Sequence, residues 1–316
     1  MEKAIELVES ACTHLAAGQA QNHPRRRLQL ASSATLHYMA AVDLTTGYLG
    51  AKIYSTHPQT GAHFLVLLYA SDGGPLAMIE ANALGQIRTG AASGVATRLL
   101  ARPAAGIVGL IGSGFQAETQ LEAVARVRRL REARVYSRSP QRQEDFASRM
   151  QALLKFPVTP VETAEQAIRG CDVAITATSA RDPVLLGEWL QPGMHINAIG
   201  SNHAKRRELD AAAVGRASLV VADSVEQARM ESGDLIAAFE QGAGSWDRVV
   251  ELADLFAGKC PGRTSENDIT LFKSNGLAVE DLAVAGYVYE RALAEREKGE
   301  GVIPTSEPAA RSPAKR

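Results

Sequence analysis

The chain has 316 residues, enough for two domains, and 46% of them are hydrophobic, enough to build buried cores. Its net charge of −1 at pH 7 argues against nucleic acid or a membrane surface as the main partner. We expect a cytoplasmic protein, because the sequence has no signal-peptide core, no run near the ~20 apolar residues that span a bilayer, and no disulfide or zinc spacing among its three cysteines.

The first hundred residues predict a helix, an antiparallel sheet and a second helix. Apolar residues at helical spacing predict the first helix over residues 2–17. Strand-like runs separated by glycine-containing turns follow at 36–42, 49–55, 63–69 and 75–80. A helix rich in small residues is expected over 87–101. Residues 1–103 therefore predict a smaller α+β domain with an antiparallel sheet.

From residue 104 the pattern alternates between strands and helices. Strands are expected at 105–111, 132–137, 172–178, 194–199 and 218–221, and helices at 118–129, 141–154 and 164–169. This alternation is typical of a Rossmann-type, doubly wound parallel sheet over residues 104–275. A last helix over 276–298 could return to the first domain, and residues 304–316 have the composition of a disordered tail. A small substrate is expected between the two domains.

The most informative local pattern is Gly112-x-Gly114-x-x-Ala117, which joins an expected strand to an expected helix. Gly112 would permit a tight turn, Gly114 would let the backbone approach a pyrophosphate, and Ala117 would let helix and strand pack closely. The start of the helix would direct free N–H groups at the phosphates. This order of elements predicts a dinucleotide-binding domain, and an ordinary glycine-rich turn is the alternative.

The end of the second strand of this domain indicates which dinucleotide binds. An acidic residue that holds a ribose 2′-hydroxyl is expected there, but the sequence reads Ser137-Arg138-Ser139, followed by Arg142. Hydroxyl and guanidinium groups suit a 2′-phosphate, which a carboxylate would repel. We therefore favour NADP(H), with NAD(H) as the alternative. For Arg142 in particular, a role as ordinary solvated surface is the competing interpretation.

Three basic positions before the nucleotide domain are candidates for binding an anionic substrate: the arginine cluster after Pro24, Lys52 and Arg88. A cation near a helix N-terminus is electrostatically disfavoured, so we expect an anion such as a substrate carboxylate beside Arg88. No metal is expected, because the seven histidines show neither H-x-x-H nor H-E-x-x-H spacing. The serine-hydrolase pattern G-x-S-x-G is also absent.

Five segments stand out when they are taken together. They are Gly50-Ala-Lys52, Ile87-Arg88-Thr89-Gly-Ala-Ala-Ser, Gly112-Ser-Gly-Phe-Gln-Ala, Gly200-Ser-Asn202-His-Ala-Lys-Arg-Arg-Glu208-Leu-Asp and Ile269-Thr-Leu-Phe-Lys273-Ser-Asn-Gly276-Leu-Ala-Val-Glu-Asp281-Leu-Ala. In motif order and spacing the chain resembles the ornithine cyclodeaminase/mu-crystallin family over nearly its whole length. Any one segment would be weak evidence, but the combination is specific.

The resemblance implies a homodimer whose antiparallel sheets pair across the interface, with NAD(P) bound by the second domain. Members of the family reduce α-imino acids, dehydrogenate amino acids, or cyclise ornithine to proline with loss of ammonia. Carried over by motif, Arg26, Lys52 and Arg88 would hold the substrate carboxylate. Arg26 is chosen by its Pro-x-Arg spacing, with Arg25 and Arg27 as alternatives. The positions implied to contact the cofactor are Thr89, Gly112, Ser113, Gly114, Phe115, Gln116, Ala117, Ser137, Arg138, Ser139, Arg142, Thr178, Ser179, Ile199, Gly200, Ser201 and Gly276.

The residues expected to take part in catalysis are Lys52, Asn202 and Asp281. The resemblance places Asp281 near the nicotinamide end of the cofactor, and Lys52 could relay a proton to the substrate. The cyclodeaminase pattern has Asp where this chain has Asn202, and an amide cannot exchange a proton with a substrate amine. We therefore expect an NADPH-dependent α-imino acid reductase, which in reverse is an amino-acid dehydrogenase. The alternatives are an ornithine cyclodeaminase that retains NAD, and a crystallin-like protein that binds NADPH without catalysis.

Overall fold

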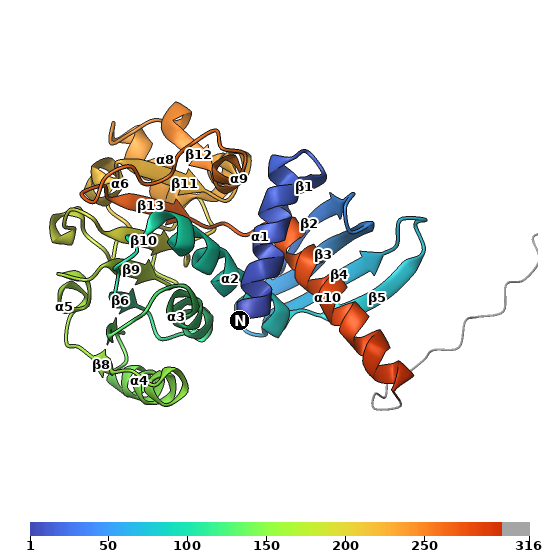
Figure 1. The fold of residues 1–316 in the computed structure, drawn as a ribbon, viewed down its shortest axis with the longest axis horizontal. Helices are drawn as coiled ribbons and strands as arrows, with labels where there is room; N and C mark the ends of the chain where they lie inside the picture. The colour runs from blue at the N-terminus through green and yellow to red at the C-terminus, as the bar shows by residue number, and fades with distance from the viewer. Residues whose placement is uncertain (299–316) are drawn as a thin grey trace, which may run out of the picture.

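The computed structural model describes residues 1–298, and the strands of this part of the chain form two separate sheets (Figure 1). One is a five-stranded antiparallel sheet near the amino terminus, and the other is an eight-stranded parallel sheet. The expected α/β architecture, a Rossmann-type parallel sheet with a smaller antiparallel one, is confirmed. The tail expected at 304–316 lies outside the described residues.

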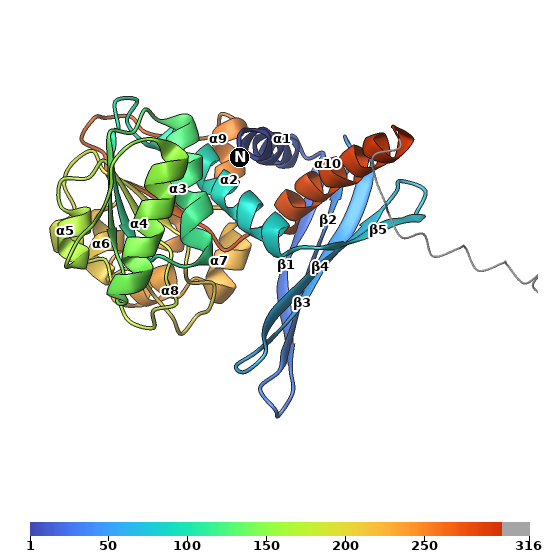
Figure 2. The same cartoon turned by 90° about the horizontal axis from the view of Figure 1, so that it is seen from below.

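The antiparallel sheet is a meander in which each strand pairs with the next. Its strands are β1 (Ala20–Gln29), β2 (Thr35–Asp43), β3 (Tyr48–His57), β4 (Gly61–Tyr69) and β5 (Pro75–Glu80). Side chains such as Met39 and Leu68 face α10 (Ala278–Glu297), whose Leu282 packs in the same apolar cluster. No helix of residues 1–298 covers the opposite face (Figure 2), where Tyr38 and Met78 are exposed.

Helices α1 (Glu2–Ala16) and α2 (Asn82–Leu100) lie between the two sheets (Figure 1). Helix α2 consists largely of small residues because its neighbours approach closely. A Cβ on Gly90 would lie 2.5 Å from the carbonyl oxygen of Thr119, which belongs to α3 (Phe115–Val127), the helix that follows β6 (Ile107–Ile111). Helix α2 begins five residues earlier than the sequence pattern indicated.

The parallel sheet has the strand order β12-β11-β13-β10-β9-β6-β7-β8. Its strands are β6 (Ile107–Ile111), β7 (Glu132–Tyr136), β8 (Val158–Pro160), β9 (Val173–Thr176), β10 (His195–Ala198), β11 (Leu219–Ala222), β12 (Val249–Glu251) and β13 (Thr270–Lys273). The chain builds outward from β6 through β7 to β8 and then returns to β9 on the other side. The point between β6 and β9 is therefore the topological switch point, where ligands bind in open α/β sheets.

Helices pack on both faces of the parallel sheet. They are α3 (Phe115–Val127), α4 (Pro140–Leu154), α5 (Ala164–Ile168), α6 (Ala211–Arg216), α7 (Val225–Glu231), α8 (Gly233–Glu240) and α9 (Leu252–Phe256), with short 3₁₀ turns at Gly187–Trp189 and Trp246–Arg248. Leu121 and Phe146 fill one face beside β6 and β7. Val214 and Leu235 fill the other face beside β10 and β13.

No helix within residues 1–298 is long and apolar enough to cross a membrane. The same residues contain no group of three or more His, Cys, Asp or Glu side chains placed to hold a metal ion. The cytoplasmic location stays a prediction.

Candidate active site

The loops expected to contact a cofactor follow neighbouring strands of the parallel sheet. Residues 112–117 follow β6, residues 137–139 follow β7, residues 178–179 follow β9, and residues 199–202 follow β10. The carboxyl ends of parallel strands meet at one edge of a sheet, so the fold brings these loops to the same edge. Gly276 follows β13 at that edge. Thr89 instead lies on α2, where its hydroxyl donates to the carbonyl of Gly85 at 2.6 Å.

The glycine turn after β6 has the form that a pyrophosphate requires. Gly112 has a φ of +116°, and a Cβ at this position would lie 2.4 Å from the carbonyl oxygen of Ala177, in the loop after β9. A Cβ on Gly114 would meet no heavy atom within 4 Å, so the backbone there is open to a ligand. Helix α3 begins directly afterwards without a side-chain cap, and Ala117 is fully buried. These residues fit a bound dinucleotide.

The turn after β7 contains Ser137, Arg138 and Ser139, and Pro140 starts α4. The buried Gln143 accepts the N–H of Ser137 at 3.0 Å and fixes this turn. Arg138 and Arg142 are both exposed at its outer side. The described turn therefore presents two guanidinium groups and no carboxylate.

A buried ion cluster lies where the antiparallel sheet meets the nucleotide domain. Lys52 Nζ on β3 is 2.8 Å from Asp281 Oδ1 on α10. Arg88 on α2 pairs through Nε with the same oxygen at 3.0 Å, and through Nη1 with Glu280 Oε2 at 2.9 Å. All four side chains are at most 7% exposed. A Cβ on Gly276 would lie 2.5 Å from Arg88 Nη1, which places the cluster at the carboxyl end of β13.

Burial changes the proton affinity of two members of this cluster. Burial, aided by Arg88 and opposed by Asp281, lowers the pKa of Lys52 to about 8. Burial raises the pKa of Glu280 to about 7, against the opposing effect of Arg88. Lys52 can therefore exchange a proton near neutral pH, as a general acid or base must.

A substrate carboxylate was expected beside Arg88, and in the structure two carboxylates of the same chain lie there; binding of a substrate carboxylate by Arg88 stays a prediction. The partners of Arg88 are Glu280 and Asp281 of the same chain. Because α2 begins at Asn82, Arg88 lies in the second turn, where the helix dipole has little effect. The presence of Arg88 therefore does not by itself require a bound anion. The two ion pairs use Nε and Nη1, and Nη2 takes part in neither.

The arginine of the cluster after Pro24 that joins the site is Arg25, and the choice of Arg26 is not supported. Arg26 is exposed, and its Nη1 lies 2.9 Å from the sulfur of Met230. The pairing of β1 with β2 shifts register between His23 and Arg26, so this irregularity breaks the alternation of faces. Arg25 is 4% exposed and donates to the carbonyl of Asn275 at 2.8 Å.

Arg25 and Arg27 share the carboxylate of Glu231, a residue of α7 in the nucleotide domain. Arg27 also donates to the carbonyl oxygen of Asn202 at 2.9 Å. These contacts tie β1 to the loop after β10. The side chain of Asn202 is exposed, and its main chain rather than its amide joins the cluster.

Sequence reasoning missed three buried acids that organise this region. Glu231 and Glu280 neutralise the arginines, and Asp223 accepts the N–H groups of Asn275 and Gly276 at 2.6 and 2.5 Å. Only Glu280 carried a signal, because it directly precedes Asp281 in the last motif. Glu231 ends the short helix α7 and Asp223 lies in the loop after β11, and neither position carries a recognisable pattern.

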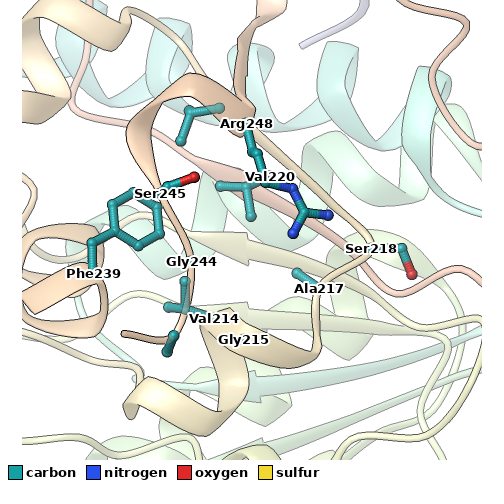
Figure 3. A pocket seen from close by; sticks show the side chains of 11 residues that line it. Val214, Gly215, Ala217, Ser218, Val220, Phe239, Gly244, Ser245 and Arg248 are labelled. Atoms are coloured by element: carbon teal, nitrogen blue, oxygen red, sulfur yellow. The ribbon is translucent and has the colours of Figure 1, made fainter. Parts of the chain in front are cut away.

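The pocket in Figure 3 lies at the opposite edge of the parallel sheet, near the amino ends of β11 and β12. Val214, Phe239 and Arg248 are among its lining residues. Its volume of about 40 Å³ is comparable to that of a single water molecule. It is therefore too small to be a substrate site.

The glycine turn at a switch point, with a buried ion cluster beside it, is the arrangement of a Rossmann-type dinucleotide-binding protein. The chain belongs to the ornithine cyclodeaminase/mu-crystallin family, whose model matches residues 1–296. The family resemblance drawn from the five sequence segments is therefore confirmed.

Two relatives show how far this similarity extends. Alanine dehydrogenase of Archaeoglobus fulgidus is 37% identical over 303 residues, which cover 93% of this chain and 92% of the relative. The structure of Thermococcus litoralis Δ1-pyrroline-2-carboxylate reductase with NADH and L-proline has a TM-score of 0.90 and 38% identity, and the match covers 94% of both chains. A third match, an archaeal alanine dehydrogenase dimer with bound NAD, has a TM-score of 0.87 and 36% identity, and covers 94% of this chain and 92% of that one.

Proposed function

We propose that this protein is an NAD(P)H-dependent reductase of α-imino acids that in reverse acts as an amino-acid dehydrogenase. The observation that carries the proposal is the buried cluster of Lys52, Arg88 and Asp281 beside the carboxyl edge of a dinucleotide-binding sheet. An imino-acid reductase and an amino-acid dehydrogenase are among the relatives that share this architecture, and a lysine cyclodeaminase with a TM-score of 0.81 and 31% identity shares it too. The bound nicotinamide supplies the hydride for the imine carbon.

The cluster can hold both ends of an α-imino acid. Arg25, Lys52 and Arg88 supply cationic donors for the carboxylate. Asp281 Oδ2 and Arg25 Nε are buried, and neither has a hydrogen-bond partner within residues 1–298. Buried polar atoms of this kind usually have partners, so their presence fits a site that a ligand completes. In this proposal Asp281 Oδ2 accepts an N–H of the substrate amine or iminium.

Lys52 is the proposed proton donor. Its pKa of about 8 keeps the ammonium form at neutral pH and still allows release of the proton. Asn202 orients a ligand or water by hydrogen bonds and carries no proton in the reaction. The cyclodeaminase pattern has a carboxyl group where this chain has Asn202, so net reduction is favoured over cyclodeamination.

The proposal is tested with purified protein, NADPH or NADH, and a panel of imino acids. The panel contains pyruvate with ammonia or methylamine, pyrroline-2-carboxylate, piperideine-2-carboxylate and iminosuccinate. Oxidation of the reduced nicotinamide with formation of the amino acid is expected for at least one of them. Conversion of ornithine to proline without net cofactor reduction would instead establish a cyclodeaminase. Tight NADPH binding without turnover would identify a binding protein.

The pH dependence should report Lys52. Because the ammonium form is the donor, kcat/KM for imine reduction should fall as pH rises through about 8, and the reverse dehydrogenation should rise. Lys52→Arg keeps the positive charge but does not titrate in this range. The residual kcat/KM of Lys52→Arg should therefore not fall as pH rises through about 8. If kcat/KM of Lys52→Arg still falls near pH 8 as it does in the wild type, another group donates the proton.

Arg25 and Arg26 form a matched pair of neighbours that separates the two assignments of the carboxylate ligand. Loss of a charge-assisted hydrogen bond of ~1.5–3 kcal/mol should raise KM for the imino acid roughly 10- to 150-fold in Arg25→Met. Arg26→Met should leave KM within about twofold, because its side chain points away. Arg25→Met also removes one of the two ion pairs of Glu231. The melting temperature of each variant shows whether a loss of stability contributes to the change in KM. A larger KM increase in Arg26→Met would reinstate the Pro-x-Arg assignment.

NADP(H) is the proposed preferred cofactor, and NAD(H) is the alternative that the NADH and NAD complexes of the relatives keep open. The support is the turn after β7, where Arg138 and Arg142 are exposed and no carboxylate replaces them.

Arg138→Asp should shift the ratio of kcat/KM values toward NADH by roughly 10-fold or more, because a carboxylate repels the 2′-phosphate. Arg131→Asp is a matched control, since Arg131 is also exposed but precedes the same strand at its opposite end. Unchanged selectivity in Arg138→Asp would place the 2′-phosphate site elsewhere.

A homodimer is the proposed assembly. The uncovered face of the antiparallel sheet contains an apolar hollow of about 420 Å³, lined in part by Ala40, Val42, Leu49, Leu67 and Tyr69. Apolar surface of this kind marks an interface. The solution mass by light scattering should be twice that of the chain, and the mass of a single chain would rule the dimer out.

A further inference from the structure

One buried carboxylate outside the ion cluster holds the two loops that follow β9 and β10. Glu208 is fully buried in the segment between β10 and α6. Its Oε1 accepts the N–H and the hydroxyl of Thr178, each at 2.7 Å. Its Oε2 accepts the N–H of Gly200 at 2.7 Å and the hydroxyl of Thr176 at 2.9 Å. Four donors on one carboxylate use nearly all of its accepting capacity.

A buried lysine holds the loop after β10 from the other side. Lys273 at the end of β13 is fully buried, and its Nζ donates to the carbonyls of Ser201 at 2.6 Å and Ala198 at 3.3 Å. The same Nζ lies 2.9 Å from Asp234 Oδ2. Asp234 Oδ1 in turn accepts the N–H of Glu208 at 2.5 Å. Glu208, Asp234 and Lys273 therefore form one connected network around residues 199–201.

The two loops are packed so closely that their relative position has little freedom. A Cβ on Gly200 would lie 2.2 Å from the carbonyl oxygen of Thr178 and 2.5 Å from Glu208 Oε1. Burying a carboxylate and an ammonium group is expensive, and apolar residues fill a core at least as well. The donors of Glu208 come from these two loops and the end of β9. The network therefore fixes the relative position of the loops after β9 and β10, and contributes less to the packing of the core.

We propose that Glu208 is a positioning residue that sets the site for the nicotinamide half of the cofactor. The proposal rests on the proposed binding of a nicotinamide dinucleotide at the switch point. The loops that Glu208 holds follow β9 and β10, on the side of β6 away from the turn after β7. The loops proposed for the pyrophosphate and adenosine, at 112–117 and 137–139, have no hydrogen bond to Glu208. Glu208 acts on one half of the cofactor through Thr178 and Gly200.

The test compares the whole cofactor with a fragment that lacks nicotinamide. In Glu208→Gln the amide nitrogen replaces one accepting oxygen and opposes two donors, so the loops must move apart. The dissociation constants of NADPH and NADH should rise at least 10-fold, and kcat should fall at least 10-fold. The dissociation constants of ADP-ribose and its 2′-phosphate, measured by calorimetry, should stay within twofold. A merely structural role would not separate these two kinds of ligand.

Thr176→Val is the matched control, because it removes one hydrogen bond to the same carboxylate but from within strand β9. It should leave cofactor affinity within about threefold. If Glu208→Gln does not fold, Glu208→Asp keeps the charge but withdraws the carboxylate from the N–H groups of Thr178 and Gly200, and it should weaken NADPH more than the fragment. Equal weakening of dinucleotide and fragment, or no change in either, would overturn the proposal. The measurement of dissociation constants does not require the protein to catalyse a reaction. It therefore tests this proposal even if the reductase assay fails.

Discussion

The ion cluster around Arg88 is the constraint on which the rest of the site depends. Breaking a buried ion pair by removing one partner costs about 3–5 kcal/mol, so Lys52, Arg88, Glu280 and Asp281 hold one another in place. They come from β3, α2 and α10, and α2 also packs against α3 behind the glycine turn. The cluster therefore fixes the positions of Lys52 and Arg88 relative to the proposed cofactor loops.

The same cluster determines how a substrate can bind. Its cations are already paired with carboxylates of the chain, so under the proposed function a substrate carboxylate would join a preorganised network rather than neutralise free charges. Asp281 Oδ1 accepts from both Lys52 and Arg88, while Oδ2 has no partner within residues 1–298. One carboxylate thus orients two cations with one oxygen, and its other oxygen is the one that the proposed function assigns to the substrate nitrogen. This arrangement reduces the reorganisation needed when the ligand arrives.

The sequence predicted the features that depend on local patterns. The glycine turn and most strands of the parallel sheet were visible because each depends on a few consecutive residues. Strand β1 was missed because its basic residues show no alternation, and the register shift near Pro24 made Arg25 rather than Arg26 the buried residue. The partners of Arg88 were missed because Glu280 lies 192 residues away in the chain. Glu208 belonged to a motif, but its four bonds depend on tertiary structure.

The position of α10 in the sequence has a consequence for synthesis. The chain makes Lys52 and Arg88 early, but their shared counterion Asp281 lies 229 and 193 residues later. Until α10 docks, these two side chains cannot be buried without an unpaired charge. A chain that lacks its last helix therefore cannot close the junction between its two sheets. The ion pairs of Lys52 and Arg88 therefore form only after α10 has docked against β3 and α2.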